Sequence, residues 1–127
     1  MPYSNTRTNA ANEARLAGAD KIRIYTSGYA LQLAEVAITL GTASVSDFVS
    51  TLSVTGLPLS GSWSDDGTAA AFRILEDETV IFEGSGFWAV NTTGALLNIS
   101  NTTAVDGATF NITSVAFTEQ AKVVGEL

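Results

Sequence analysis

The sequence predicts an all-β fold: a single β-sandwich, of jelly-roll type, with about eight short strands. Two observations predict it. Stretches in which apolar and polar residues alternate are separated by turns that contain Gly, Asn or Asp. The composition also favours strands, with 16 threonines against only two lysines. An immunoglobulin-like sandwich is the alternative, because the Cys pair of antibody domains is optional elsewhere.

Residues 67–83 predict a β-hairpin around which the sheet is organised. A three-residue acidic turn, Glu76-Asp77-Glu78, gives a register that keeps one face of the hairpin apolar. On the opposite face, Arg73 lies diagonally from Glu83, close enough for a surface ion pair. A two-residue loop would instead set Arg73 opposite Phe82. The predicted buried face consists of Phe72, Ile74, Val80 and Phe82.

Before the hairpin, the chain is expected to form an arm and three strands. Residues 1–18 form the arm, in which Asn9–Ala17 favours a short helix that Gly18 ends. This helix is too short to be stable alone in water. Residues 19–127 then form the sandwich body. The expected strands are residues 21–27, 34–40 and 48–54, and the longest loop is residues 56–67, which contain Pro58 and three glycines.

After the hairpin, three more strands are expected. In the last of them, the inward-facing set shifts from Phe110 and Ile112 to Val115 and Phe117. That change of parity predicts a β-bulge near residues 113–114. The expected strands are residues 87–90, 95–99 and 108–117, with a Thr-rich loop at residues 100–107.

The composition excludes most catalytic chemistry. The chain has 127 residues, enough for one domain with a core, and it contains neither Cys nor His. Ser-His-Asp and Cys-His groups and thiolate metal sites cannot form. The remaining enzyme hypothesis is a hydrolase that pairs Asp65 or Asp66 with Glu83, and a small sandwich with acids in turns offers little cleft for it. We therefore expect no enzymatic activity, no cofactor and no metal.

The net charge of −7 is unevenly distributed along the chain. Residues 1–23 contain four basic and two acidic residues (+2), whereas residues 24–127 contain two basic and eleven acidic residues (−9). An acidic body lacks the basic stripe that nucleic acid needs. A basic arm on such a body is typical of a segment that docks on an acidic partner. A locally solvated helix explains the charge equally well.

Targeting signals are not evident in the sequence. No stretch reaches the ~18 apolar residues of a membrane-spanning helix, and the first residues lack the apolar core of a signal peptide. We therefore expect a soluble protein made in a cytoplasm, without a membrane partner.

Three further candidate binding sites have simpler explanations. The acidic turns at residues 65–66 and 76–78 offer oxygen ligands for Ca²⁺, but their spacing matches no calcium loop, which favours solvated turns. Aromatic side chains can form a platform for a sugar, although core packing is their commoner role. The residues of that platform are Trp63, Trp88, Phe87, Tyr25 and Tyr29. The lone Gly84-Ser-Gly86 has no following helix or Lys, which argues against a phosphate site.

Several short segments follow one another in a characteristic order: Tyr3-Ser-Asn, Asn9–Ala17, Arg23–Gly28, Leu33–Val36, Gly67–Ile74, Thr79-Val80, Glu83-Gly84, Leu97–Ile99 and Val105–Ser114. In this order they resemble a family of small tailed-bacteriophage virion proteins. The resemblance covers most of the chain, through strand and turn patterns. One difference is that such proteins often have Pro after the Gly of the first strand, where this chain has Tyr29.

The resemblance implies a β-sandwich decoration (cement) or minor structural protein, and it brings no catalytic residues with it. The first hypothesis is thus a capsid decoration protein that binds the major capsid protein across capsomers, as a dimer or trimer on the virion surface. Its expected docking residues lie in the arm: Tyr3, Arg7, Arg15 and Leu16. The alternative is a tail or fibre module that recognises host glycans through Trp63, Trp88 or Tyr29, and the hydrolase ranks last.

Overall fold

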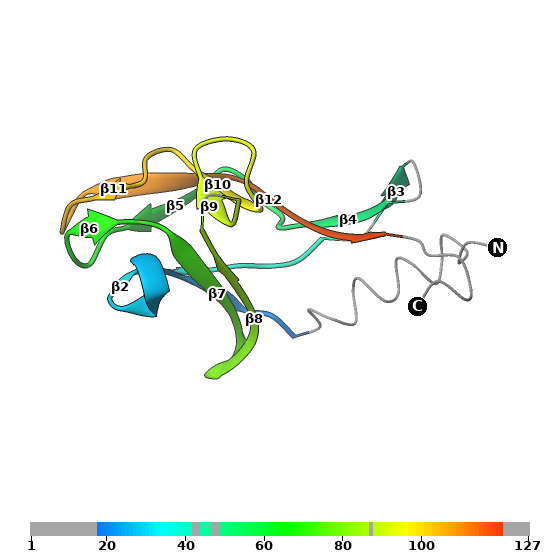
Figure 1. Ribbon diagram of the computed structural model, residues 1–127. Helices are drawn as coiled ribbons and strands as arrows, with labels where there is room; N and C mark the ends of the chain where they lie inside the picture. Colours follow the sequence, from blue (N-terminus) through cyan, green and yellow to red (C-terminus); the bar gives the residue numbers. More distant parts are fainter. Residues whose placement is uncertain (1–17, 42–43, 47–48, 87, 121–127) are drawn as a thin grey trace.

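The computed structural model describes residues 18–41, 44–46, 49–86 and 88–120 (Figure 1). The prediction of an all-β, sandwich-like fold is confirmed, with twelve strands among these residues instead of about eight. The jelly-roll connectivity stays a prediction. The elements are β1 (Lys21–Tyr25), the short 3-10 helix η1 (Ser27–Tyr29), β2 (Gln32–Ala37), β3 (Ser44–Ser46), β4 (Val49–Ser53), β5 (Leu59–Ser62), β6 (Gly67–Thr68), β7 (Ala71–Glu76), β8 (Thr79–Ser85), β9 (Val90–Asn91), β10 (Leu97–Ile99), β11 (Thr103–Ala104) and β12 (Thr109–Gln120).

The strands form two main sheets and a small one. The first sheet has the order β2-β1-β7-β8, and its strands are all antiparallel. The second has the order β3-β4-β12-β10-β9, with β5 also paired to β12, and its β9–β10 pair is parallel. β6 and β11 form a separate two-stranded pair. Figure 1 shows the first sheet packed against the part of the second that contains β5, β10 and the start of β12.

The core fills the space between the two sheets. It consists of alternate residues from facing strands, as a sandwich requires. Trp63 stacks on Phe110, with 4.0 Å between ring centroids. Gly61 makes this packing possible, since a Cβ there would come within 2.6 Å of Phe110 and 2.8 Å of Val36. The largest fully buried side chains include Ile22, Ile24, Leu33, Phe72, Ile74, Leu97, Ile99 and Ile112.

The predicted register of the hairpin is wrong. β7 and β8 are joined by the two-residue turn Asp77-Glu78, and a register shift after Ile74 leaves Ile81 without an opposite residue. This bulge restores the pairing that a two-residue loop would otherwise misalign, so Arg73 faces Glu83 directly. Asp77 supplies the left-handed turn residue, with φ = 56°.

The register also changes the membership of the core. Phe72 and Ile74 are fully buried as predicted, and Phe82 is half-buried. Val80, in contrast, is 41% exposed, and Leu75 is fully buried outside the main core cluster. A bulge reverses which side chains face inward on one side of it, and sequence alternation alone does not show where it lies.

Several other elements differ from the expectation. β5 lies inside the stretch predicted as the longest loop, because its Gly61 makes room for core side chains instead of marking a turn. β11 lies in the predicted Thr-rich loop, and β3 lies between the predicted strands 34–40 and 48–54. The bulge near residues 113–114 is confirmed, because Asn98 pairs with Ser114 and Ile99 with Ile112, which skips Thr113.

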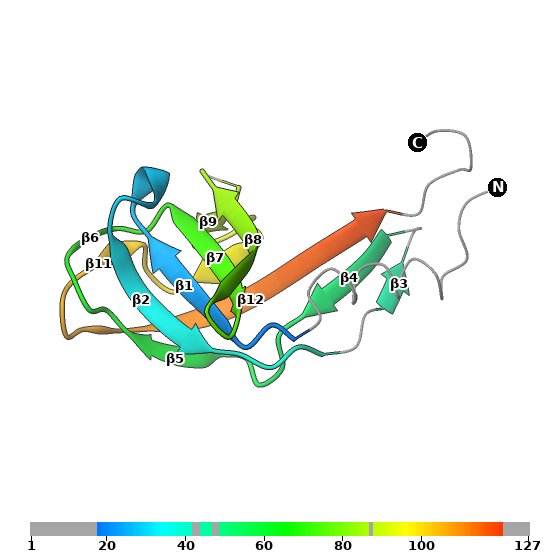
Figure 2. The ribbon, with the colours of Figure 1, turned by 90° about the horizontal axis from the view of Figure 1, so that it is seen from below.

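A ribbon extends from the sandwich on one side. Residues 116–120 of β12 pair with β4, and β4 pairs with β3, so three strands continue beyond the region covered by the first sheet. Figure 2 shows β12 and β4 running side by side away from β1, β2, β7 and β8. We call β3, β4 and residues 116–120 the ribbon.

The predicted arm falls outside the described residues. This applies to the Asn9–Ala17 helix and to the four expected docking residues, Tyr3, Arg7, Arg15 and Leu16. The division of the chain at residue 18 therefore stays a prediction.

Candidate functional site

Among the described residues, the aromatic side chains considered for a sugar platform differ widely in exposure. Trp63 is only 2% exposed and belongs to the core. Tyr25 and Tyr29 meet edge to face on the outer side of the first sheet, with 5.5 Å between ring centroids. Trp88 is 73% exposed. The side chain of Phe87 lies outside the described residues. Of the candidate sugar-binding rings, Trp88 alone is largely accessible.

The outer face of the first sheet instead contains Arg and Glu side chains that form ion pairs. Glu35, Arg23, Arg73 and Glu83 are directly opposite one another in a row across all four strands. Arg23 Nε donates to Glu35 Oε1 at 2.7 Å, and Arg73 Nε donates to Glu83 Oε2 at 2.9 Å. The ion pair predicted between Arg73 and Glu83 is thus confirmed.

Glu78 joins two cations at the hairpin turn. Lys21 Nζ donates to its Oε1 and Arg23 Nη2 to its Oε2, each at 2.8 Å. These two hydrogen bonds favour the ionised carboxylate and lower the pKa of Glu78 to about 2. The hydrogen bond with Glu78 in turn raises the pKa of Lys21. The hydrogen bond with Glu35 is the chief cause that raises the pKa of Arg23. The row and this bridge together leave each described cation with an anionic partner.

Tyr29 packs against Arg73 from an unusual backbone position. Its φ is 58° and that of Gly28 is 70°, both in the left-handed region. This conformation places the Arg73 guanidinium carbon 4.3 Å from the Tyr29 ring centroid and 4.9 Å from that of Tyr25. Burial is the chief cause that raises the pKa of Tyr29. Proline, whose ring holds φ near about −65°, could not adopt this angle.

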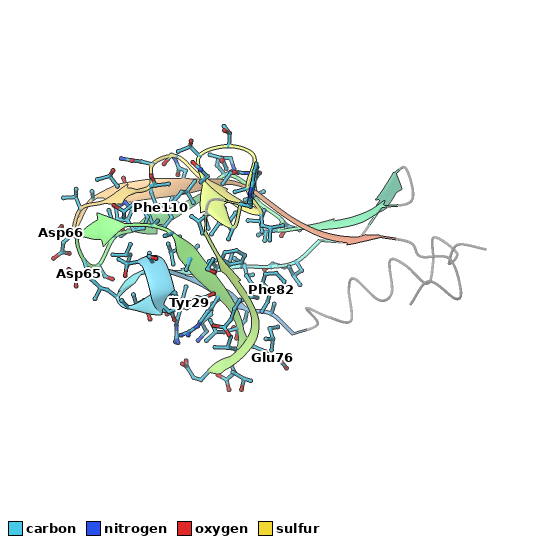
Figure 3. All side chains as sticks on the ribbon, viewed as in Figure 1. Tyr29, Asp65, Asp66, Glu76, Phe82 and Phe110 are labelled. Carbon is cyan, nitrogen blue, oxygen red and sulfur yellow. The ribbon has the colours of Figure 1, made fainter. Side chains whose placement is uncertain are left out.

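The acidic residues considered for a hydrolytic pair or a calcium site lie in separate parts of the described structure. Figure 3 shows Asp65 and Asp66 well separated from Glu76 at the hairpin turn. Asp65 Oδ1 accepts the Asp66 backbone N–H, and Asp66 Oδ1 accepts the Asp106 N–H, both at 2.8 Å. Glu83 is engaged by Arg73. Within the described ranges, no three acidic residues gather in a way that could hold a metal.

A shallow hollow lies beside Trp88. Its volume is ≈ 500 Å³, and it lies where the end of β8 approaches the loop between β9 and β10. Among the described residues, those that line it are small or apolar and none is ionisable: Gly84, Ser85, Trp88, Ala89, Gly94, Ala95 and Leu96. Sequence reasoning named Trp88 but could not indicate the hollow, whose walls come from two separate turns.

Comparisons with known proteins add no relative. No family model matches the chain, and no curated protein or solved structure matches it significantly. Among the described residues, no helix is long and apolar enough to cross a membrane.

Proposed function

We propose that this chain is a non-enzymatic structural protein of a tailed-bacteriophage virion: a decoration protein that binds the capsid surface across capsomers. The ribbon is the observation that supports this most. The sequence resemblance to small virion proteins points the same way.

The ribbon suits attachment better than catalysis or self-contained folding. Stable domains bury each sheet against a second layer, and short isolated strands are marginal in water. The first sheet does not extend over residues 116–120, as Figure 2 shows. A ribbon of this kind gains stability when it lies on another protein surface. We propose that this surface belongs to the major capsid protein.

The arm is the second proposed contact. Arg7 and Arg15 would donate directional hydrogen bonds to carboxylates of the shell, and Tyr3 and Leu16 would supply apolar anchors. Capsid surfaces present two-fold and three-fold sites, which fits a dimer or trimer. The competing role of the arm is to cover an open sheet edge of its own sandwich.

Copy number in the intact particle tests the proposal. Quantitative mass spectrometry of purified virions should find on the order of hundreds of copies, as expected for a protein that binds repeated capsomers. A handful of copies would instead favour the alternative, a tail or fibre module. That alternative would use the rings of Trp63, Trp88 or Tyr29 to bind glycans. Trp63 is buried and Tyr29 packs on Arg73, so among the described residues only Trp88 is left for this role.

Two variants separate the ribbon from the arm. Thr51 lies in the middle strand of the ribbon, paired with Thr118 and Ser44, so Thr51→Pro should disrupt the ribbon's hydrogen bonds. We expect this variant to lose binding to capsids from which this protein has been removed, while its melting temperature stays near that of the parent. A chain lacking residues 1–18 should behave likewise. Aggregation or a much lower melting temperature of the truncated chain would place the arm in its own core.

A further inference from the structure

We infer that one edge of the ribbon is a dimer interface, in which residues 116–120 of β12 pair with the same residues of a second copy of the chain. The two strands run antiparallel and are centred on Thr118. The edge concerned is the one that faces away from β4, and we call it the outer edge. This inference goes beyond the proposed function, because it assigns the contact between two copies and not the attachment to a capsid.

The outer edge begins where β12 changes its neighbours. Between residues 109 and 115, β12 pairs with β5 on one edge and with β10 on the other, and Ile112 pairs with both. The pairing with β10 ends at Val115, whereas β4 pairs with residues 116–120 on the same edge as β5. Within the described residues no strand pairs with the outer edge, and Figure 2 shows β4 along one side of this part of β12. The backbone groups of such an edge can pair with a further strand.

The end strands of the two main sheets are less suited to pairing. In β2, the Leu33 carbonyl oxygen accepts the Ser64 N–H at 2.8 Å and the Ser64 hydroxyl at 3.1 Å. β3 and β9 have only three and two residues, and β8 contains the bulge at Ile81, which is a common protection of an edge. Residues 116–120 instead pair with β4 without a register shift, so their backbone is regular.

The sequence of the outer edge is complementary to a second copy of itself. Antiparallel pairing about Thr118 sets Ala116 opposite Gln120 of the second copy and Phe117 opposite Glu119 of the second copy. The two Glu119 positions are therefore not opposite each other. Like charges directly opposite would destabilise the pair, in a chain whose net charge is already −7.

A row of hydroxyl-bearing residues would continue across the interface. Within one copy, Ser44, Thr51 and Thr118 are directly opposite one another across β3, β4 and β12. The two-fold axis sets Thr118 opposite Thr118 of the second copy, which extends this row over six strands. Pairs of threonines are among the cross-strand pairs that stabilise antiparallel sheets.

β10 limits the register of the dimer. A second strand shifted towards the sandwich would meet the position beside Val115 that Leu97 already occupies. A shift of two residues the other way would set Glu119 opposite its own copy and leave part of the edge unpaired. Pairing about Thr118 uses the whole outer edge of both copies. A two-fold contact of this kind uses the same surface twice and therefore gives a dimer.

Charge at position 118 tests the axis. Thr118→Lys and Thr118→Glu each place like charges opposite one another, so each variant alone should dimerise roughly tenfold more weakly than the parent. An equimolar mixture of the two should restore dimers, because each Lys then meets a Glu. Sedimentation equilibrium measures the mass against the 13.2 kDa of one chain. The matched control is Thr51→Lys, which is opposite Thr118 within one copy but lies on the middle strand, and it should dimerise like the parent.

A cysteine at the same position gives an independent measurement. The chain contains no Cys, so Thr118→Cys can form a disulfide only with a second copy. Residues directly opposite in antiparallel strands have Cβ atoms about 4.5–5.5 Å apart, which a small adjustment brings within reach of a disulfide. We expect covalent dimers of Thr118→Cys after mild oxidation. Thr51→Cys, on a strand that is paired on both edges, should give few.

Three results would overturn the inference. The first is a parent chain that stays monomeric at about 100 μM, where an interface of micromolar affinity would be filled. The second is that Thr118→Lys and Thr118→Glu dimerise like the parent, or that their mixture fails to restore dimers. The third is that Thr51→Cys cross-links as readily as Thr118→Cys.

Other occupants of the outer edge would also be recognised. A monomeric parent whose Thr118→Lys variant binds capsids less well would assign the edge to a segment of the shell protein. A monomer in which all amides of residues 116–120 are protected from hydrogen exchange would assign it to another segment of the same chain. Either result would overturn the dimer. None of these results changes the copy number expected for a decoration protein, so the two proposals fail separately.

Discussion

The outer faces of the two sheets use different chemistry. The first sheet holds every Lys and Arg among the described residues, namely Lys21, Arg23 and Arg73, each paired with a glutamate. The sandwich part of the second sheet (β5, β10 and residues 109–115) contains no charged residue.

Amides and hydroxyls take the place of ion pairs on the second sheet. Asn98 Nδ2 donates to Ser114 Oγ at 2.7 Å, and Ser60 Oγ donates to Asn111 Oδ1 at 3.0 Å. Thr113 Oγ1 donates to the Asn98 carbonyl oxygen at 3.1 Å.

This difference predicts how each face responds to its surroundings. Ion pairs between exposed groups weaken with added salt and with loss of either charge, whereas neutral hydrogen bonds respond to neither. The first sheet should therefore be the part of the sandwich that senses pH and ionic strength, and the second sheet should not. Four experiments test this comparison and the core that both sheets share.

The largest expected effect is on the shared core. Ile74→Asp places an unpaired carboxylate among apolar side chains, which costs several kcal/mol or neutralises the acid. We expect no soluble, folded protein, as judged by circular dichroism and gel filtration. The matched control is Val80→Asp on the neighbouring strand, because Val80 is 41% exposed. If Val80→Asp is as damaging as Ile74→Asp, the register with a bulge at Ile81 is wrong.

The second effect is on the neutral face. Asn98 Oδ1 accepts the Ala95 N–H, and Asn98 Nδ2 donates to the Ala95 carbonyl oxygen, both at 3.0 Å. Asn98→Ala should lower the free energy of unfolding in urea by about 1–3 kcal/mol, because partly buried groups lose their partners. The loss should be the same at 50 mM and 1 M NaCl. A double-mutant cycle with Ser114→Ala should show coupling, and a salt-dependent loss would argue against the comparison.

The third effect is on the charged face. Arg73→Ala removes the ion pair to Glu83 and the contact with Tyr29, both partly open to water. We expect a loss of stability far smaller than for Ile74→Asp, and one that shrinks at 1 M NaCl. Arg73→Lys should recover little, since an ammonium reproduces neither the planar stacking nor the guanidinium geometry. Unfolding by Arg73→Ala would contradict the assignment of this face as a surface.

The smallest effect concerns acid. The pKa of Glu78 is about 2 in the folded protein against 4.5 for the free group, so its contribution to stability is complete above pH 4.5. It is lost as the pH falls towards 2. We expect the stability difference between the parent and Glu78→Gln to shrink over this range in thermal melts. A difference that stays constant between pH 6 and 2.5 would show that the bridge to Lys21 and Arg23 does not form in solution.

Local sequence was sufficient for the fold class and for one contact. Alternation of Ile22 and Ile24 with charged neighbours identified β1, and the parity change after Ile112 identified the bulge in β12. The Arg73–Glu83 pair is predicted as diagonal neighbours, and the bulge in the actual register places the two directly opposite each other. These features depend on residues close in sequence, where backbone periodicity decides which side chains share a face.

The tertiary structure decided the register of the hairpin, the role of Gly61 and the fate of the two tryptophans. Trp63 is buried because Phe110, from a strand distant in sequence, stacks on it, whereas Trp88 lies on a turn and is 73% exposed. The bulge at Ile81 likewise depends on which side chains the opposite sheet can accept. Composition alone excluded the catalytic groups that need Cys or His. Which rings and charges remain accessible was set by packing between residues far apart in the chain.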